Sequence, residues 1–312
     1  MKLKNLLLVV IGIAANFASY AQSNLLNAKS PSEIGKKTAA QLESDNDKPL
    51  PYGYVHDRDV LMGKTTWENI DLDERINFPL YYPIDTAFVG KERRSLFQVL
   101  INGIKSGKIS DIYADDYFNI KKSLKDMESV FKYTDTTKEG KNEFQNYYDD
   151  YKSGKKILSK EFINVTDLTA KDVTGYKIKG FWYFDKRQSE LKYRLLAICP
   201  MALEAKDLAP KDDPGASKVE LIPIELFWVY FPSIRDILHD AKAFNDRNSA
   251  MPITFDQLLN SRRFNGVIYK EENVYGDREI KDYMKDNAQM QLLESERVKE
   301  KIRDFEQDMW TY

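Results

Sequence analysis

Histidine and cysteine, the side chains most often used in metal centres and in nucleophilic catalysis, are scarce in this 312-residue sequence. They occur only as His56, His239 and Cys199. A single cysteine excludes an intrachain disulfide, a Cys-based zinc site and a Cys-x-x-Cys redox pair, and two histidines exclude a multi-histidine metal centre. A Ser-His-Asp triad would have to use one of these two histidines. Composition therefore excludes many enzyme classes before any motif is considered.

The short motifs that could carry chemistry are incomplete. Gly63-Lys64-Thr65-Thr66 matches the end of a P-loop, but Arg58 stands where the first glycine of the phosphate cradle is required. The segment 153–156 fits Ser-x-x-Lys but lacks the companion motifs of that enzyme class. Adjacent aspartates at 115–116, 149–150 and 212–213 diverge on a strand or a helix, so we interpret them as solvating loop residues. We expect no catalytic residue, no cofactor and no bound metal, and hence a protein that is not an enzyme.

The charge balance does not indicate a nucleic-acid partner. Lys and Arg total 47 against 49 Asp and Glu, which gives a formal net charge of -2 at pH 7. Recognition of nucleic acid or of an anionic lipid surface relies on a basic surplus. We therefore expect neither as a direct partner.

The N-terminus has the pattern of a cleaved secretory signal. Lys2 and Lys4 precede an apolar stretch at 6–15, and Ser19-Tyr20-Ala21 forms a small-x-small cleavage site. The apolar stretch is shorter than the roughly 20 residues that a spanning helix needs. We expect a signal peptide at 1–21 and export to the periplasm. Residues 22–54 are polar and proline-containing, which predicts an extended N-terminal arm that is either disordered or ordered on a neighbouring subunit.

Two amphipathic segments predict core-facing helices in a domain that spans 55–276. The first has apolar residues at helical spacing over 96–104, and the second opens with Phe255, Leu258 and Leu259. The runs 98–107 and 257–266 share Gln and Gly at the same spacing, with each glycine placed as a helix stop. Each run is followed by a Tyr- and Asp-rich connection, at 113–117 and at 269–277. This pattern indicates either a weak internal duplication or two segments that share a common motif by convergence.

A β-hairpin is the strongest strand signal. The segments 176–184 and 191–198 alternate aromatic or aliphatic with polar residues on either side of a short polar connector. A third strand is predicted at 219–230, with Pro223 at an edge or a bulge. The predicted fold class is α+β, an antiparallel sheet with helices on one face. Four aromatic residues of these strands, Phe181, Tyr183, Trp228 and Tyr230, are expected in the core. The alternative is an exposed stacking platform of a carbohydrate-binding module or enzyme, formed by Trp182, Trp228 and neighbouring tyrosines.

The C-terminal segment 277–312 predicts a long charged helix, because it contains neither proline nor glycine. Its apolar positions Val298, Ile302, Phe305 and Met309 recur at spacings of four, three and four, which gives one narrow apolar stripe. Such a stripe packs either on its own domain or on another subunit. We expect these four residues to contribute partner contacts.

Several long aromatic-rich segments carry a family resemblance. They are SLFQVLINGIKSGK at 95–108, IKGFWYFDKR at 178–187, LKYRLLAICP at 191–200, ELFWVYFP at 225–232 and YKEENVYGDR at 269–278. With these segments the chain resembles the GldN (PorN) family of gliding-motility proteins over about 55–284. The signal peptide and the absence of a cysteine at the cleavage site agree with it.

The resemblance implies a structural role in the type IX secretion system, which secretes proteins across the outer membrane and supports gliding motility. Proteins of this family form a periplasmic ring with the outer-membrane lipoprotein GldK (PorK), and the motor subunit GldM (PorM) contacts that ring. This chain is accordingly expected to self-associate and to reach the inner face of the outer membrane through the lipoprotein. A mixed-charge surface suits the packing of many identical copies.

Overall fold

The computed structural model describes residues 48–87, 89, 93–148, 152, 159–208, 222–244, 253–285 and 287–310. The predicted signal peptide and most of the predicted N-terminal arm lie outside the described residues. The chain divides into two units, and the larger one comprises Gly53–Phe244 and Ile253–Tyr312. Of the smaller unit, the described residues 48–52 form neither helix nor strand. All elements below belong to the larger unit.

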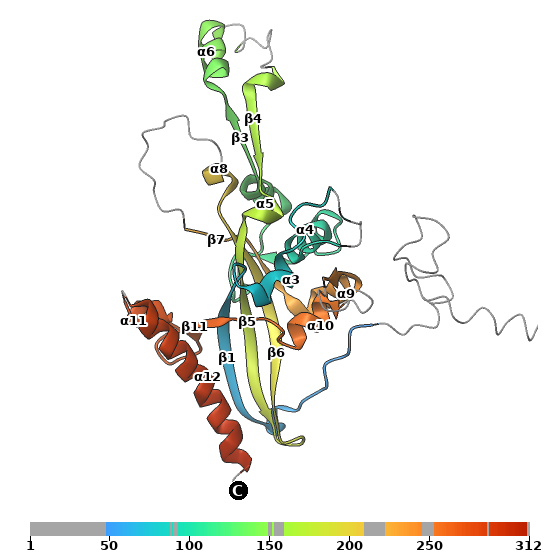
Figure 1. The fold of residues 1–312 in the computed structure, drawn as a ribbon, viewed down its shortest axis with the longest axis vertical. Coiled ribbons are helices and arrows are strands. Elements are labelled where there is room, and N and C mark those ends of the chain that lie inside the picture. Colours follow the sequence, from blue (N-terminus) through green and yellow to red (C-terminus); the bar gives the residue numbers. More distant parts are fainter. Residues whose placement is uncertain are drawn as a thin grey trace, which may run out of the picture. The chain divides into compact units, whose positions relative to one another are not determined.

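An antiparallel seven-stranded sheet organises this unit (Figure 1). Its path runs β11 (Val267–Glu271), β1 (Val60–Asp71), β5 (Val173–Asp185), β6 (Glu190–Ala202), β8 (Trp228–Tyr230) and β2 (Ile112–Tyr113), and β7 (Ile224–Glu225) pairs with β6. The predicted hairpin is confirmed as β5 and β6, which pair from Asp185–Glu190 to Val173–Ala202. The predicted third strand is shorter than expected: its described part forms β7 and β8, separated by Leu226 and Phe227.

Strand β1 has the polar sequence VLMGKTTWENID and pairs with β5 on one side and β11 on the other. Residues 63–66, which match the end of a P-loop, lie inside this extended strand. An extended strand gives its backbone amides to its neighbours, so this segment does not form a phosphate cradle.

One face of the sheet is apolar and is covered by helices, as the fold class predicts. Ile70, Ile178, Leu195, Ile198 and Val229 project from successive strands into one core cluster. The helices that supply the opposing side chains are α3 (Phe78–Tyr81), α4 (Leu96–Lys105), α9 (Phe231–Asp240) and α10 (Phe255–Asn260), shown in Figure 1. Burial of these side chains is the main stabilising contribution to the fold.

The two predicted amphipathic helices are confirmed as α4 and α10, but they end differently. Gly107 has φ +73°, as a helix-stop glycine requires. After α10 the left-handed residue is Arg262, with φ +51°. The prediction that Gly266 stops this helix is wrong. Gly266 instead lies against Glu68, whose carboxylate a β-carbon at position 266 would meet at 2.9 Å.

A buried ion pair joins β1 to the segment after α10. The Arg262 guanidinium donates two hydrogen bonds to the Glu68 carboxylate, at 3.0 and 2.8 Å. Glu68 is buried on the apolar face, and the guanidinium also lies 4.2 Å from the ring centroid of Tyr193 and 4.9 Å from that of Trp182. This bidentate geometry compensates for the cost of removing the carboxylate from water.

The C-terminal helix begins later than the sequence predicts. Residues 277–287 contain a short helix, α11 (Ile280–Tyr283), and the long helix α12 spans Ala288–Trp310. The side chain of Asn287 accepts a hydrogen bond from the amide of Met290, which is the geometry of a helix N-cap. Figure 1 shows α12 beside β11, and the two elements are in contact.

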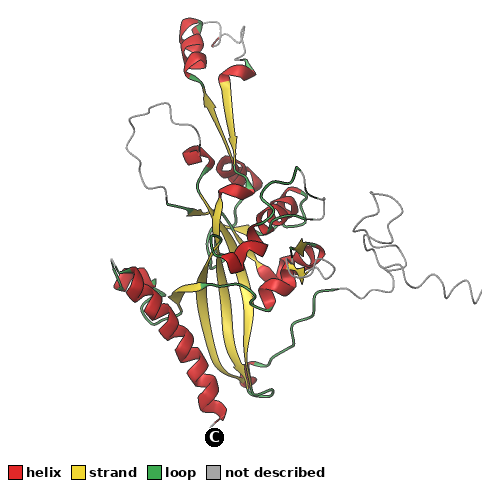
Figure 2. Cartoon of the chain, viewed as in Figure 1, coloured by secondary structure: helices red, strands yellow, loops and turns green. Residues whose placement is uncertain are grey.

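The remaining elements lie outside the main sheet. They are α5 (Leu124–Phe131), β3 (Lys132–Thr136), α6 (Lys138–Asn146), β4 (Ile163–Asp167), α8 (Ala205–Leu208), β9 (Lys242–Ala243) and β10 (Ile253–Thr254). Strands β3 and β4 form a separate two-stranded antiparallel sheet, visible in Figure 2, which we call the β3–β4 ribbon.

Candidate functional site

The four residues predicted to contact a partner lie on the side of α12 that faces the chain's own sheet. Val298 and Ile302 are 1% and 6% exposed and form a cluster with Ile268 of β11. Phe305 is half-buried, with its ring edge-on to Phe184 at 6.0 Å between centroids, and Met309 is also half-buried. Of the two locations that the sequence left open for the stripe, the structure has the intramolecular one. A partner contact through these residues stays a prediction, and it would require α12 to leave the sheet.

The aromatic strands do not form a shared stacking platform. Trp228 is 1% exposed and packs with Trp67 on one face of the sheet. Trp182 packs near α12 on the opposite face, because the side chains of a strand alternate between the two faces. The core position expected for Trp228 is therefore confirmed. Of the other three strand aromatics expected in the core, Tyr183 is buried, Phe181 is half-buried and Tyr230 is exposed.

The second face of the sheet carries a row of lysines and aromatic residues. Trp67 of β1 pairs with Lys179 of β5 on one side and with Lys270 of β11 on the other. Both ammonium groups lie over the indole ring, at 4.9 and 4.2 Å from its centroid. A cation over an indole face is attracted by the ring quadrupole, and the attraction is larger where water is excluded. One buried tryptophan thus helps to hold two lysines of like charge.

A third lysine extends this row. Lys177 donates a hydrogen bond to Glu225 at 2.7 Å and lies 4.5 Å from the ring centroid of Tyr269. The other carboxylate oxygen of Glu225 accepts a hydrogen bond from the indole nitrogen of Trp228 at 2.8 Å. Glu225 therefore uses both oxygens to link β7 to β5 and β8.

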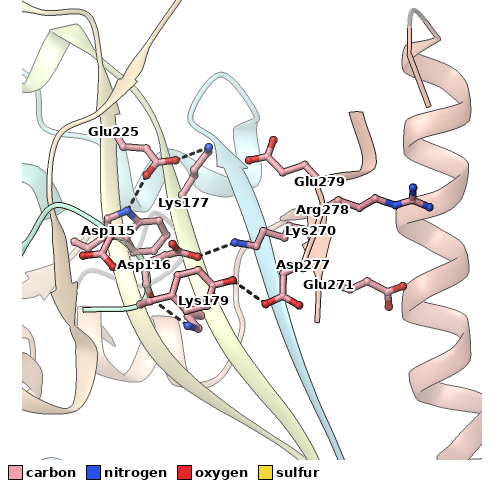
Figure 3. Close-up of polar contacts among 12 residues, drawn as sticks. Asp115, Asp116, Lys177, Lys179, Glu225, Lys270, Glu271, Asp277, Arg278 and Glu279 are labelled. Atoms are coloured by element: carbon pink, nitrogen blue, oxygen red, sulfur yellow. Dashed lines mark hydrogen bonds and ion pairs between the residues drawn. The ribbon is translucent and has the colours of Figure 1, made fainter. Parts of the chain in front are cut away.

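Two loops close over the lysine row, and they come from opposite edges of the sheet. The first follows β2 and places Asp116 against Lys270, at 2.9 Å. Lys179 donates to the backbone carbonyl oxygen of Asp116 at 3.0 Å. The second follows β11, and its Asp277 accepts a hydrogen bond from the Tyr117 hydroxyl at 2.7 Å. Figure 3 shows Lys270 directed at Asp116 and Lys177 directed at Glu225. These loops are the Tyr- and Asp-rich connections noted in the sequence, and here they meet.

Unusual backbone conformations concentrate in the two loops. Phe118 has φ +62°, Gly276 has φ +77° and Asp277 has φ +56°. Left-handed conformations are costly for residues other than glycine and persist only where surrounding contacts enforce them. Asp115 supplies some of these contacts, because its carboxylate accepts hydrogen bonds from the amides of Asn119 and Ile120. The prediction that Asp115 and Asp116 only solvate a loop is wrong: one shapes the loop and the other pairs with a lysine.

The two central lysines titrate differently. Burial lowers the pKa of Lys179, and nearby carboxylates such as Asp116 only partly oppose this. Burial also acts to lower the pKa of Lys270, but the hydrogen bonds and charge interactions with Asp116 and Tyr117 together outweigh it, and the pKa is raised. Burial raises the pKa of Tyr117, and its hydrogen bond to Asp277 acts in the same direction. We call the lysine row (Lys177, Lys179 and Lys270) and the two loops that cover it the latch. Within the latch, the ion pair between Lys270 and Asp116 is the strong ionic contact.

No pattern in the sequence singles out Trp67, Lys179 or Lys270. Alternation of lysine with apolar residues on β5 was a usable signal for one polar face, but it does not say which loops cover that face. Among the described residues there is no group of three or more His, Cys, Asp or Glu side chains placed to hold a metal ion. No helix of the described part of the chain is both long and apolar enough to cross a membrane.

Comparison with known proteins assigns the family. The family model "Gliding motility associated protein GldN" matches residues 55–311. The matched range begins just before β1 and includes both loops of the latch and all of α12. No curated protein matched the chain. Because the family model covers most of the sequence, the chain belongs to the GldN family of gliding motility associated proteins.

Proposed function

We propose that this protein is a structural subunit of the type IX secretion system. In this proposal the chain is exported by its N-terminal signal and lies in the periplasm at the inner face of the outer membrane. There it forms a ring with a GldK-like (PorK-like) lipoprotein and contacts a GldM-like (PorM-like) motor subunit, and it is required for secretion and gliding motility. The observation that carries the proposal is the GldN family match over 55–311.

The arrangement of α12 favours one surface for the partner contacts. Val298 and Ile302 are used inside the chain, so an intact fold offers the other side of the helix. Met290, Leu292 and Leu293, in the first turns of α12, are large apolar side chains that are exposed. Exposed apolar residues grouped at one end of a helix are typical of contact surfaces. We propose this end of α12 as a contact with the lipoprotein or the motor subunit.

The test is a pull-down of tagged protein from detergent-solubilised native envelopes, followed by mass spectrometry and negative-stain microscopy. The expected result is a GldK-like lipoprotein in ring-shaped particles. Recovery of a lone monomer from envelopes that contain the lipoprotein would reject the proposal.

The contact on α12 is tested in the same assay with Leu293→Glu, which should reduce recovery of a partner. Gln289→Glu is the matched control, because it places the same charge one helical turn earlier at an exposed position without removing an apolar side chain. Equal recovery with both variants would remove this end of α12 from the proposal.

The alternative function, a carbohydrate-binding module or an enzyme with an aromatic platform, requires exposed rings on one face. Trp228 is buried and Trp182 lies on the opposite face of the sheet. Titration with oligosaccharides should leave the tryptophan fluorescence unchanged, and saturable quenching would support the alternative instead.

A further inference from the structure

The β3–β4 ribbon lacks the partners that a two-stranded sheet ordinarily needs. Its five cross-strand pairs run from Lys132–Asp167 to Thr136–Ile163, and among the described residues no third strand joins either edge. None of its ten residues is buried, although α8 packs near both strands. Isolated two-stranded sheets are marginally stable in water. The open edges of this ribbon are therefore places where a further strand would add stability.

The two edges differ in how well they are protected against pairing. On β3, Lys132 and Asp135 are charged, and the amide of Thr136 already donates to the Asp135 side chain at 2.8 Å. Lys141 of α6 also pairs with Asp135 at 3.5 Å. Charges and satisfied amides are the means by which edge strands avoid joining other chains. Strand β3 is thus the protected edge.

Strand β4 has the opposite character. Four of its five residues, Ile163-Asn164-Val165-Thr166, carry no charge, and three of these four are β-branched. Val165, at the centre, is 49% exposed. An uncharged, β-branched open edge is a template for another strand.

We propose that β4 is a self-association edge, at which β4 of a second copy adds antiparallel and completes a four-stranded sheet across the two molecules. The inference rests on the self-association in the proposed function and adds to it a two-fold contact between two copies. Such a contact closes at a dimer, so the ring also needs a heterologous interface elsewhere on the chain.

The sequence of β4 is compatible with antiparallel pairing to β4 of a second copy. A two-fold antiparallel pair centred on Val165 places Val165 opposite Val165, Asn164 opposite Thr166 and Ile163 opposite Asp167. No two like charges face each other, and the central pair is β-branched and apolar, which is a favourable cross-strand combination. The same arrangement makes the two ribbons run in opposite directions, so the folded regions at their bases lie at opposite ends of the four-stranded sheet. An interface of this kind is isologous, because each copy contributes the same residues.

Disulfide cross-linking tests the position of the two-fold axis. Residues directly opposite each other in an antiparallel pair have Cα atoms about 4.5–5.5 Å apart, which lies within the range that a disulfide bridges. The Val165→Cys variant should therefore form a covalent dimer on mild oxidation. Cys199 is fully buried and should give no background.

The matched control is Thr134→Cys. Thr134 is exposed and faces Val165 across the ribbon. In the proposed four-stranded sheet its copy lies three strand spacings away, about 14 Å, which is too far for a disulfide. Equal cross-linking of the two variants, or none with Val165→Cys at any protein concentration, would overturn the proposal.

Charge substitution tests the same contact without a covalent bond. Val165→Lys places like charges opposite each other and should raise the dimer dissociation constant roughly tenfold or more in sedimentation experiments. Mixing Val165→Lys with Val165→Glu should restore the dimer, whereas Thr134→Lys should behave as wild type. A wild-type dissociation constant for Val165→Lys would overturn the proposal.

The envelope pull-down separates this inference from the proposed function. Loss of the lipoprotein from the wild-type sample rejects the proposed function. Recovery of the lipoprotein with wild type, together with no Val165→Cys cross-link in the same envelopes, rejects only the pairing of β4 strands. A third outcome is loss of the lipoprotein with Val165→Lys but not with Thr134→Lys, again without a cross-link. This outcome would mean that an extended segment of the lipoprotein pairs with β4, and it would overturn pairing with a second copy.

Discussion

The Tyr117 hydroxyl donates a hydrogen bond to the carboxylate of Asp277 at 2.7 Å, across 160 residues of sequence. Each residue lies in a loop that follows an edge strand of the main sheet, β2 or β11. The bond therefore connects the two edges over the face that the helices leave uncovered. It is the outermost contact of the latch, since Tyr117 is 45% exposed whereas Trp67 beneath it is buried.

Replacing Tyr117 by phenylalanine should lower the free energy of unfolding by about 1 kcal/mol at pH 7. A hydrogen bond to a charged group contributes more than this when buried, but partial exposure reduces the effect. Tyr275→Phe is the matched control in the second loop, because its exposed ring can keep its contact with Arg278. Denaturant titration of both variants measures the difference, and equal stabilities would show that the Tyr117–Asp277 bond contributes nothing.

The same variant should change the acid dependence of stability. Burial acts to raise the pKa of Asp277, but the hydrogen bonds from Asn273 and Tyr117 and the charges of Lys270 and Lys179 together outweigh it, and the pKa is lowered. A lowered folded pKa gives stability that is present above the ordinary value, 3.8, and is lost as the pH falls through the folded value. In Tyr117→Phe this loss should be smaller and should occur at higher pH. Melting temperatures between pH 2 and pH 6, roughly the window set by linkage, would check it.

The two lysines over Trp67 should respond differently to replacement by methionine. Lys270→Met leaves Asp116 without its ionic partner and should cost about 2 kcal/mol. Lys179→Met removes a cation whose burial already disfavours its charge, so its net effect at pH 7 should stay within about 1 kcal/mol.

Alkaline titration separates the two lysines further. The pKa of Lys179 is lowered because burial disfavours its charged form, so the charged side chain costs free energy on folding. This cost decreases as the pH rises from the folded pKa towards 10.5, and stability increases over that window. This increment should be absent in Lys179→Met. The raised pKa of Lys270 has the opposite effect, with stability lost above 10.5. A larger loss of stability at pH 7 for Lys179→Met than for Lys270→Met would contradict this account.

Breaking the Glu68–Arg262 pair should be among the most destabilising single changes. Arg262→Met leaves a buried carboxylate uncompensated and should cost about 3–5 kcal/mol. Arg187→Met is the control, because Arg187 is exposed and lies 3.9 Å from Asp59, and exposed pairs contribute little. In the double variant Glu68→Gln/Arg262→Met the cost should be clearly smaller than the sum of the two single changes. Additive costs would mean that the two residues act independently.

The side of α12 that faces the sheet should contribute to the stability of the fold. Ile302→Ala removes a buried side chain from the contact with β11 and should cost about 3 kcal/mol. Arg303→Ala, on the exposed side, should change stability by less than about 0.5 kcal/mol. Thermal unfolding compares the two. An unchanged melting temperature for Ile302→Ala would indicate that α12 is not anchored on the sheet.

The sequence predicted the elements whose pattern reflects their own burial. Strands β5 and β6 and helix α4 have the regular spacing of apolar residues that burial on one face produces, and they were found. Strand β1 was not, because its residues on the apolar face include Thr66 and Glu68. A buried glutamate is tolerated there only because Arg262, nearly 200 residues later, neutralises it, and a local pattern holds no trace of that partner.

The predicted end of helix α10 was wrong and the candidate site was not predicted, for related reasons. Gly266 had the same spacing from Gln as Gly107, yet Arg262 takes the left-handed position after α10, since the pairing with Glu68 holds it there. The lysines of β5 alternate with apolar residues, but that alternation does not indicate the two loops, from distant parts of the chain, that lie over them. Each failure involves a contact between segments that the sequence separates widely.

The position of β1 also has a consequence for the order of folding. β1 pairs with β5, which ends at Asp185, and with β11, which begins at Val267. A chain that emerges N-terminus first therefore keeps one edge of β1 unpaired, with Glu68 lacking its arginine, until Arg262 and β11 have appeared, both of which lie in the last fifth of the sequence. Such distant pairing slows folding and prolongs the exposure of an unpaired strand. Chains truncated before β11 should consequently be recognised by proteases and chaperones as unfinished, however complete their hairpin is.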